Sequence, residues 1–410
     1  MSFSNLRVGE GVFSDNSIVN CEYHSHQPYA ATTFNNNDEI RIPIQTQDVY
    51  TLPSQSYLYV EGKLLKDDGK TISKDLHFVN NGITFLFDEI RYELAGTAID
   101  RTRNPGITTT LKTFASYTVN QCTRLENAGW NHTQHPQINN KNGYFSVCIP
   151  LSMLLGFAED FPKIIMNVRQ ELVLIRSNTD LNCVINVPVT GTDKPKIDIT
   201  KIMWKMPHVA VADIEKLRLM KYIDKDLEVA FRSWELQELP LLQTSTRHTW
   251  TVKTTSQLEK PRFIIFALQT DRKNSTGKSM SEFDDCNLTN VKLYLNSDVY
   301  PYDNMNLNFE KNQWSILYEM YAQFQKSYYF KNGSDGGVEP CLSPINFKHF
   351  GPFVVIDCSH QSEAVKTGAV DIRLEFETSQ NVPDKTTAYC LILHDRLIKY
   401  NPLTSVIKIF

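Results

Sequence analysis

The sequence predicts an all-β protein in which one polypeptide forms two similar antiparallel β-sandwiches. Short runs of alternating apolar and polar residues recur between turn-forming residues along the 410-residue chain, as is typical of strands covered on one face. The same order of strands, amphipathic helix and closing strands occurs twice, roughly 200 residues apart. Any all-β chain has regularly spaced strands, so the shared order is the stronger indication of a duplicated fold.

Paired strands open each half of the chain. Residues 40–44 alternate isoleucine with polar residues and proline, and residues 249–253 alternate tryptophan and valine with threonine and lysine. A second strand follows in each half, at residues 57–65 and 262–270. These strands indicate that the two halves begin in the same way.

The next strand of each half ends in a tight turn. Residues 90–94 lead to Gly96 and residues 291–295 lead to Asn296, and both turn residues tolerate a positive φ angle. Charged residues surround the first of these turns, and we expect them to form local ion pairs without a catalytic role: Arg91, Glu93, Asp100 and Arg101.

A helical pattern follows the turn in each half. In the first half the spaced residues are Leu111, Phe114, Thr118 and Cys122, and in the second they are Trp314, Leu317, Tyr318, Tyr321 and Phe324. The threonines of the first pattern would serve a strand equally well. Closing strands then follow at residues 145–149 and 169–176, and at 353–357 and 371–377. In the last of these, Ile372, Leu374 and Phe376 are expected to face the core.

The chain is long enough for two domains of about 200 residues each. The expected division is an N-terminal arm at 1–33, a first sandwich at 34–206, a linker with a short helix at 207–240, a second sandwich at 241–398 and a C-terminal tail at 399–410. Within the linker, Pro207 is expected to end a strand, and Asp213 to cap a helix that contains Ile214, Leu217 and Met220.

Composition excludes several classes of protein. The formal net charge is only −4, whereas a nucleic-acid surface normally carries a clustered basic stripe, so no sequence-specific nucleic-acid binding is expected. No run approaches the length of a membrane span. Residues 1–20 contain no apolar run that would serve as a secretion signal, so the eight scattered cysteines are expected to be reduced thiols inside the cell.

Candidate metal and catalytic residues are few. His24 and His26, with Cys21 nearby, suggest a cupin-like metal site, but the carboxylate that such a site needs is replaced by Tyr29 and Ala30. We therefore expect no metal and no cofactor. Two pairs suggest a nucleophile or a general base, namely Cys358 with His360 and His394 with Asp395. Both lie in or beside strands without a glycine-rich nucleophile turn, which favours structural roles and a non-enzymatic protein.

Aromatic residues in the second half are the best candidates for contacts between subunits. Their helical spacing also fits a face packed inside the chain, but the excess of tyrosine suits a partly hydrated contact surface. The candidates for a subunit interface are Trp234, Trp250, Trp314, Tyr318, Tyr321, Phe324, Tyr328 and Tyr329. The candidates for an assembly tail, which would add a strand to a partner's sheet edge, are Val406, Ile407, Ile409 and Phe410.

Several long runs resemble one family of viral proteins. Residues 80–107 read NNGITFLFDEIRYELAGTAIDRTRNPGI, residues 293–309 read LYLNSDVYPYDNMNLNF, and the chain ends in TAYCLILHDRLIKYNPLTSVIKIF. The runs YEMYAQFQKSYY and IDCSHQ add to the likeness. From about residue 34 onward the chain resembles the double jelly-roll major capsid proteins of the Polinton or Maverick group, including adintovirus-like elements, in the lineage of adenoviruses and tailless bacteriophages.

This resemblance implies two eight-stranded jelly rolls side by side and a structural role in a virion capsid. Three chains would close into a pseudo-hexameric trimer that tiles an icosahedral shell, assembled in the cytoplasm or nucleus of the host cell. The implied partners are further copies of the chain and a penton or minor capsid protein of single jelly-roll type, while a membrane beneath the shell is left open. The alternatives are a jelly-roll module that binds carbohydrate or protein and, third, a bicupin metalloenzyme.

The two chain ends are expected to act as assembly arms. The first 33 residues are polar and show no apolar period, so we expect them to be poorly anchored in an isolated subunit. Their removal is expected to spare the trimer but impair the shell, whereas removal of residues 400–410 is expected to weaken the subunit or the trimer as well.

Overall fold

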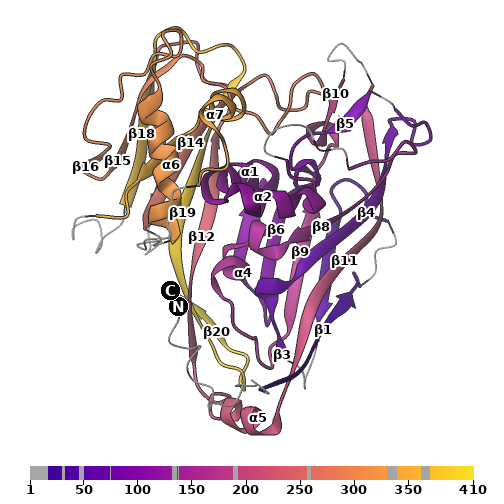
Figure 1. Cartoon of the computed structure of the whole chain (residues 1–410). Coiled ribbons are helices and arrows are strands. Elements are labelled where there is room, and N and C mark those ends of the chain that lie inside the picture. Colours follow the sequence, from indigo (N-terminus) through magenta and orange to yellow (C-terminus); the bar gives the residue numbers. More distant parts are fainter. Residues whose placement is uncertain are drawn as a thin grey trace, which may run out of the picture.

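The computed structural model describes residues 17–29, 33–45, 50–73, 75–131, 136, 138–187, 193–255, 260–329, 339–361 and 370–410. Figure 1 shows two β-sandwiches side by side with helices between them. The strand pairs formed by the described residues are all antiparallel. The all-β fold predicted from the sequence is therefore confirmed.

The first sandwich has two main sheets. One has the order β1 (Ile18–His26), β11 (Pro195–Val211), β4 (Tyr57–Lys66) and β8 (Tyr144–Pro150), with β3 (Tyr50–Thr51) also beside β11. The other has the order β2 (Glu39–Ile44), β9 (Gln170–Arg176), β6 (Phe87–Leu94) and β7 (Thr97–Arg103). A small separate sheet pairs β10 (Val184–Asn186) with β5 (Leu76–Phe78).

The second sandwich repeats this plan. One sheet has the order β12 (Leu227–Leu239), β19 (Thr386–Tyr400), β14 (Pro261–Thr270) and β17 (Val354–Asp357), with β20 (Ile407–Ile409) also beside β19. The other has the order β13 (Arg247–Thr255), β18 (Val370–Thr378), β15 (Leu288–Leu295) and β16 (Asp298–Tyr300).

Both sandwiches share one strand order. When the eight principal strands of each half are counted along the chain, one sheet runs first, eighth, third, sixth and the other runs second, seventh, fourth, fifth. This is the order of a jelly roll, in which long connections repeatedly cross from one sheet to the other. The duplication predicted from the sequence is therefore confirmed at the level of topology.

The first strand corrects the expectation for the N-terminal arm. Residues 18–26 of that predicted arm form β1, which pairs along β11 from Ile18 opposite Val211 to His26 opposite Trp204. Eight of its nine residues are exposed, so no apolar period marks the strand in the sequence. Backbone pairing anchors it, together with a few side-chain contacts such as that between His26 and His208. Residues 1–16 lie outside the described residues.

Apolar alternation places the core as predicted. Ile40, Ile42 and Ile44 are fully buried on β2. On β18, Ile372 and Leu374 are fully buried while the intervening Arg373 is exposed. Each sheet thus turns one apolar face inward, and burial of that face is the main force that closes each sandwich.

Helices lie at matching places in the two jelly rolls. Between the fifth and sixth strands, the first roll has α1 (Pro105–Ser116), α2 (Val119–Leu125) and the 3-10 turn Glu126–Ala128, and the second has α6 (Ser315–Tyr329) and α7 (Pro344–Phe350). The first helical pattern is therefore two helices and not a strand. Thr118 begins the second one, because its hydroxyl accepts from the Gln121 amide and the Gln121 side chain accepts from the Thr118 amide.

The remaining helices are short. They comprise α3 (Leu151–Leu154), α4 (Gly156–Asp160), α5 (Asp213–Met220) and the 3-10 turns Pro53–Gln55, Gly82–Leu86 and Leu181–Cys183. No helix among the described residues is long and apolar enough to cross a membrane.

The connection between the jelly rolls contains the predicted helix but is shorter than the predicted linker at 207–240, because residues 227–239 form β12 of the second roll. Two details of the prediction are also corrected. The strand does not end at Pro207 but continues to Val211, because the Pro207 carbonyl still accepts from the Leu52 amide at 3.1 Å and only one donor is lost. Asp213 is the first helical residue and does not cap the helix, since Ala212 occupies the cap position without a side-chain bond. Figure 1 shows α5 at one end of the molecule, remote from α7.

Candidate functional site

A buried helix, α1, lies at the junction between the jelly rolls (Figure 1). All twelve of its residues are buried, including a run of threonines. The hydroxyls of Thr109 and Thr110 donate back to the carbonyls of Pro105 and Gly106, at 2.5 and 2.7 Å, and Thr109 also accepts from the Asn81 amide at 2.7 Å. These bonds satisfy the hydroxyls that made a strand an equal prediction from the sequence.

A buried ion pair extends from this helix. The Lys112 ammonium lies 2.6 Å from Glu159 Oε1 on α4, and the lysine side chain is fully buried. The rings of Tyr117 and Trp234 face the ammonium at 4.8 and 4.9 Å, in reach of cation–π attraction. Burial lowers the pKa of Lys112, and the Glu159 carboxylate acts in the opposite direction.

The same carboxylate joins the two jelly rolls. Glu159, in the first roll, accepts hydrogen bonds from the hydroxyls of Tyr328 and Tyr329 on α6 of the second roll, at 3.0 and 3.1 Å. One acidic side chain therefore receives a cation from its own roll and two phenols from the other. Removal of Lys112 or Glu159 would leave the charge of the other buried without compensation.

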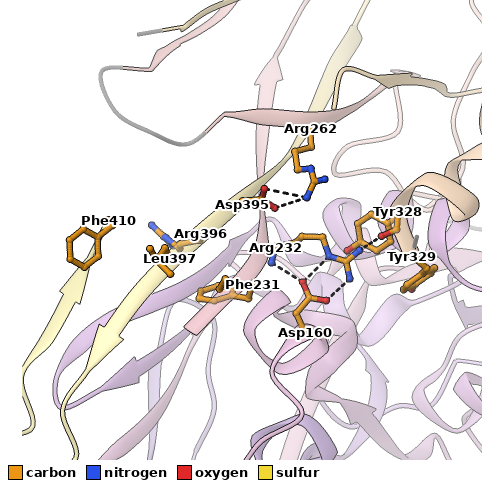
Figure 2. A pocket seen from close by; sticks show the side chains of 11 residues that line it. Asp160, Phe231, Arg232, Arg262, Tyr328, Tyr329, Asp395, Arg396, Leu397 and Phe410 are labelled. Carbon is orange, nitrogen blue, oxygen red and sulfur yellow. Dashed lines mark hydrogen bonds and ion pairs between the residues drawn. The ribbon is translucent and has the colours of Figure 1, made fainter. Parts of the chain in front are cut away.

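A second ion pair crosses the junction beside the first (Figure 2). The Arg232 guanidinium on β12 donates through Nε to Asp160 Oδ2 at 2.7 Å, and its Nη2 pairs with Oδ1 of the same carboxylate. Its Nη1 also donates to the Tyr328 carbonyl at 2.5 Å. Burial opposes the charge of Arg232, but the hydrogen bonds to Asp160 together with the charges of Asp160 and its neighbours outweigh this effect and raise the pKa of Arg232.

Asp100 supplies a third polar link. It is buried on β7 and accepts from the Phe157 amide at 2.9 Å and from the Ser233 hydroxyl of the second roll at 2.8 Å. Burial raises its pKa, against the opposing effect of these donors. The expectation of a local surface ion pair is wrong for Asp100, because it lies on the strand face turned toward the second roll.

Two other charged residues near that turn, Arg91 and Glu93, form the local ion pairs that were predicted. Arg91 forms ion pairs with Glu93 at 2.8 Å and with Glu89 at 3.2 Å. Arg101 is exposed on the neighbouring strand. These ion pairs lie within β6, are partly exposed and do not reach the junction.

Close backbone approach completes the junction. A Cβ atom added to Gly156 would lie 1.7 Å from the Arg232 carbonyl oxygen, so only glycine allows α4 to approach β12 this closely. The junction therefore combines three polar links with a glycine contact. Its charged groups pair with one another, and the arrangement joins the two rolls through buried contacts.

The charged residues Lys112, Glu159, Asp160 and Arg232 of this junction were missed in the sequence. The Asp160–Arg232 contact joins positions 72 residues apart, and periodicity predicts which face of an element is buried but not what it meets. One usable signal exists, since Lys112 interrupts an otherwise uncharged helical pattern that runs from residue 105 to 116.

Most of the aromatic interface candidates lie in the chain's own core. Six of the eight are buried, namely Trp234, Trp250, Trp314, Tyr321, Phe324 and Tyr328, while Tyr318 and Tyr329 are partly exposed. Their spacing places them on the face of α6 that packs inward and on inward positions of β12 and β13. In the described chain the six buried side chains are not available to a partner, so the expectation of an exposed aromatic surface is corrected.

The candidate assembly tail lies on the sheet of its own chain. β20 pairs with β19, Ile409 opposite Ile398, and the Phe410 amide donates to the Leu397 carbonyl at 2.9 Å. Val406, Ile409 and Phe410 nevertheless remain between two-fifths and half exposed. Figure 2 shows Phe410 at one side of a groove of about 720 Å³ whose other lining residues include Arg232 and Arg262.

A second groove lies on the outer face of α6. Its volume is about 430 Å³, and it is bounded by α6, by Pro301 and by the strand β17. β17 is the last strand in its sheet among the described residues, and Ile316 on α6 is 57% exposed. This groove joins apolar surface to a sheet edge, a combination that suits protein contacts.

The histidines considered for a metal site come together with a third. His26 Nε2 lies 3.1 Å from His208 Nε2, and the His24 ring stacks on the His208 ring with centroids 4.2 Å apart. Cys21 occupies the opposite face of β1, because successive strand residues alternate. Burial and the charges of His208 and His24 lower the pKa of His26 to about 4. Among the described residues no group of three or more His, Cys, Asp or Glu is arranged to hold a metal ion.

The two candidate catalytic pairs are not aligned for catalysis. Cys358 is buried, donates to the Pro261 carbonyl at 3.4 Å, and has its pKa raised by burial. His394 Nδ1 contacts the backbone carbonyl of Asp395, whose carboxylate instead binds Arg262 at 3.1 and 3.2 Å. Neither pair brings a nucleophile to a base.

Comparison with known proteins agrees with this architecture. The double jelly roll-like domain family matches residues 76–398. The chain belongs to this family. No curated protein matches the chain by sequence, so the likeness rests on the family match and on solved structures.

Three solved structures illustrate the shared double jelly-roll fold. The chain of the Sputnik virophage structure superposes with a TM-score of 0.65 at 9% identity, covering 100% of this chain and 92% of that one. VP54 of PBCV-1 gives 0.60 at 10% identity and covers 98% of both chains. The mavirus major capsid protein gives 0.58 at 11% identity, covering 100% and 93%. At these identities the comparison establishes the fold of this double jelly-roll protein.

Proposed function

We propose that the chain is the major capsid protein of a Polinton- or Maverick-like DNA virus or endogenous element. Three copies close into a homotrimer, and these capsomers tile an icosahedral shell. The observation that carries the proposal is the side-by-side pair of jelly rolls with one strand order, fixed to each other by the buried junction. The mavirus major capsid protein shares this fold.

Geometry gives the reason for a trimer. Two similar sandwiches per chain produce six in a closed threefold ring, so the outline is six-sided although the symmetry is threefold. Such a tile transmits lattice forces only if the two sandwiches of one chain do not hinge. The buried links of Glu159, Asp160 and Asp100 across the junction supply that stiffness.

The proposed partners follow from the same role. Neighbouring capsomers form the lattice, and a penton or minor capsid protein of single jelly-roll type occupies the remaining positions. The proposed location is the virion shell, assembled in the cytoplasm or nucleus of the host cell.

The mass of the purified protein tests the trimer. Three chains of 47.1 kDa give a particle of about 141 kDa, to be measured by light scattering behind a sizing column at micromolar concentration. Obligate interfaces bury about 2,000 Å² or more, so a trimer should persist on dilution. A folded monomer at that concentration would contradict the proposal.

A further inference from the structure

Two cysteines from different jelly rolls meet in the interior. Cys122 lies on α2 of the first roll, and Cys341 precedes α7 of the second. Their Sγ atoms are 3.0 Å apart although the residues are separated by 219 positions in the sequence, and both side chains are buried. The separation leaves no room for another atom between them and exceeds a disulfide bond by about 1 Å.

The backbone on both sides of this pair is held in place by α6. The Tyr321 hydroxyl donates to the Phe114 carbonyl at 3.0 Å and accepts from the Leu342 amide at 2.8 Å. It thereby bonds to the helix that precedes α2 and to the residue next to Cys341. Gln325 adds a bond to the Tyr117 carbonyl at 2.8 Å. The thiols are therefore brought together by a fixed frame and not by a mobile contact.

We propose that Cys122 and Cys341 are a modification site at which a disulfide bond joins the two jelly rolls. The pair stays reduced inside the cell and is oxidised when the protein enters an oxidising medium. The timing of the oxidation rests on the proposed capsid function, because a particle leaves the cell after assembly. The ability of the two cysteines to form a disulfide does not depend on that function.

The oxidant is a small disulfide such as oxidised glutathione. The thiolate of one cysteine attacks the S–S bond of that molecule, which forms a mixed disulfide and releases one small thiol. The second cysteine then attacks the protein sulfur of the mixed disulfide and releases the other small thiol. The protein pair loses two electrons and two protons, and the small disulfide is reduced to two thiols.

Access determines the rate of this exchange. The hydrogen bond between the two thiols and the burial of Cys341 raise the pKa of Cys341. The closed structure therefore disfavours the thiolate. α2 has only seven residues, of which only Cys122 and Leu125 are buried. Local opening of this helix exposes a thiol without unfolding either sandwich, so oxidation is expected to be slow but complete.

The chain offers a matched control pair. Cys358 and Cys390 are also buried, but Cys390 lies on β19 and Cys358 directly follows β17, with β14 between those two strands. A strand between them prevents a bond without rearrangement of the sheet. Oxidation should therefore be selective for one pair of buried thiols.

The test uses the purified full chain in a series of glutathione redox buffers, followed by alkylation and intact mass measurement. We expect the loss of two hydrogen atoms, a cross-linked peptide containing Cys122 and Cys341, and a higher melting temperature that reverts on reduction. Cys122→Ser and Cys341→Ser should abolish the cross-link, and Cys390→Ser should retain it. Circular dichroism confirms that each variant folds.

Three results would overturn the proposal. They are the absence of the cross-linked peptide in the wild-type chain at every buffer potential, its formation at another pair, and a cross-link that survives in Cys122→Ser. Wild-type peptide mapping decides the question even if a serine variant fails to fold. Light scattering on the same samples reports the trimer separately, so a failed disulfide and a failed capsid assignment are distinguishable.

Discussion

At the scale of single residues, the junction depends on groups that tolerate little change. Gly156 permits the contact between α4 and β12, Lys112 and Glu159 neutralise each other in the interior, and Asp100 receives donors from both rolls. The role of each residue follows from its contacts with the second jelly roll or with neighbouring side chains of the first. Substitutions at these positions therefore test whether the two sandwiches are one mechanical unit.

Gly156→Ala should destabilise the fold strongly. The added Cβ would lie 1.7 Å from the Arg232 carbonyl, so α4 must move and the neighbouring Asp160 link must weaken. We expect a loss of about 3 kcal/mol or more in the free energy of unfolding, measured with urea. Gly96→Ala is the control, because that site has positive φ but no atom within 4 Å, and it should cost only about 1 kcal/mol.

A cost for Gly156→Ala no larger than for Gly96→Ala would show that α4 and β12 separate freely. In that case the junction would be a soft contact between two independent sandwiches.

Lys112→Met should lower the free energy of unfolding, and a second substitution at Glu159 should restore much of it. The variant leaves the Glu159 carboxylate buried without its cation, and breaking a buried pair costs about 3–5 kcal/mol. Adding Glu159→Gln removes the stranded charge and keeps one oxygen that accepts from a tyrosine hydroxyl, while the amide NH2 can donate to the oxygen of the other tyrosine. The double variant should therefore regain much of the loss. Urea unfolding of the wild type, both single variants and the double variant measures the coupling.

The exposed pair of Lys408 and Asp226 is the matched control. Its atoms lie 3.5 Å apart and its side chains are about half exposed, so Lys408→Met should cost under about 1 kcal/mol. Equal effects of Lys112→Met and Lys408→Met would mean that water reaches the junction.

At the scale of elements, β1 is the part of the first sandwich most sensitive to its surroundings. It is an edge strand whose side chains are largely exposed, and His26 and His208 join it to β11. The pKa of His26 is lowered to about 4 from an unfolded value near 6.5. A lowered pKa means that the unfolded chain binds the proton first, so stability is present above pH 6.5 and is lost as pH falls toward 4.

His26→Gln should flatten this part of the pH profile. We expect the wild type to lose stability between about pH 6.5 and pH 4, and the variant to lose less over the same interval, because no proton binds at position 26. Urea unfolding at several pH values measures both profiles. Parallel profiles for the two proteins would show that His26 does not couple protonation to folding.

Comparison of individual elements with their predictions shows what could be predicted from the sequence. Ile372, Leu374 and Phe376 were predicted to face the core because a strand covered on one face alternates its residues. β1 was missed because exposed side chains leave no such alternation. The aromatic residues of α6 were placed at an interface because spacing identifies a buried face but does not reveal whether the same chain or a partner buries it.

At the scale of the whole molecule, the distribution of buried and exposed apolar residues indicates which surfaces are available for subunit contacts. Most of the aromatic residues predicted for an interface are buried in the core of the chain. The proposed trimer must therefore use other, exposed apolar surface. The groove between α6 and β17 offers such surface beside a sheet edge. The tail at Ile409 and Phe410 offers a second, smaller patch. A second copy of the chain is the occupant that we expect for the groove between α6 and β17.

Ile316→Glu should therefore separate the subunits without unfolding them. Ile316 lines the groove and is 57% exposed, so a carboxylate there remains hydrated in the monomer but would be buried in a trimer. We expect the subunit affinity to fall by about 2 kcal/mol or more, roughly thirtyfold, seen as a shift from trimer to monomer in light scattering. Ile345→Glu on α7, where isoleucine is 81% exposed outside this groove, should leave the trimer intact. A trimer that withstands Ile316→Glu would place the threefold contact on another face, since an isolated glutamate cannot enter an apolar interface without this cost.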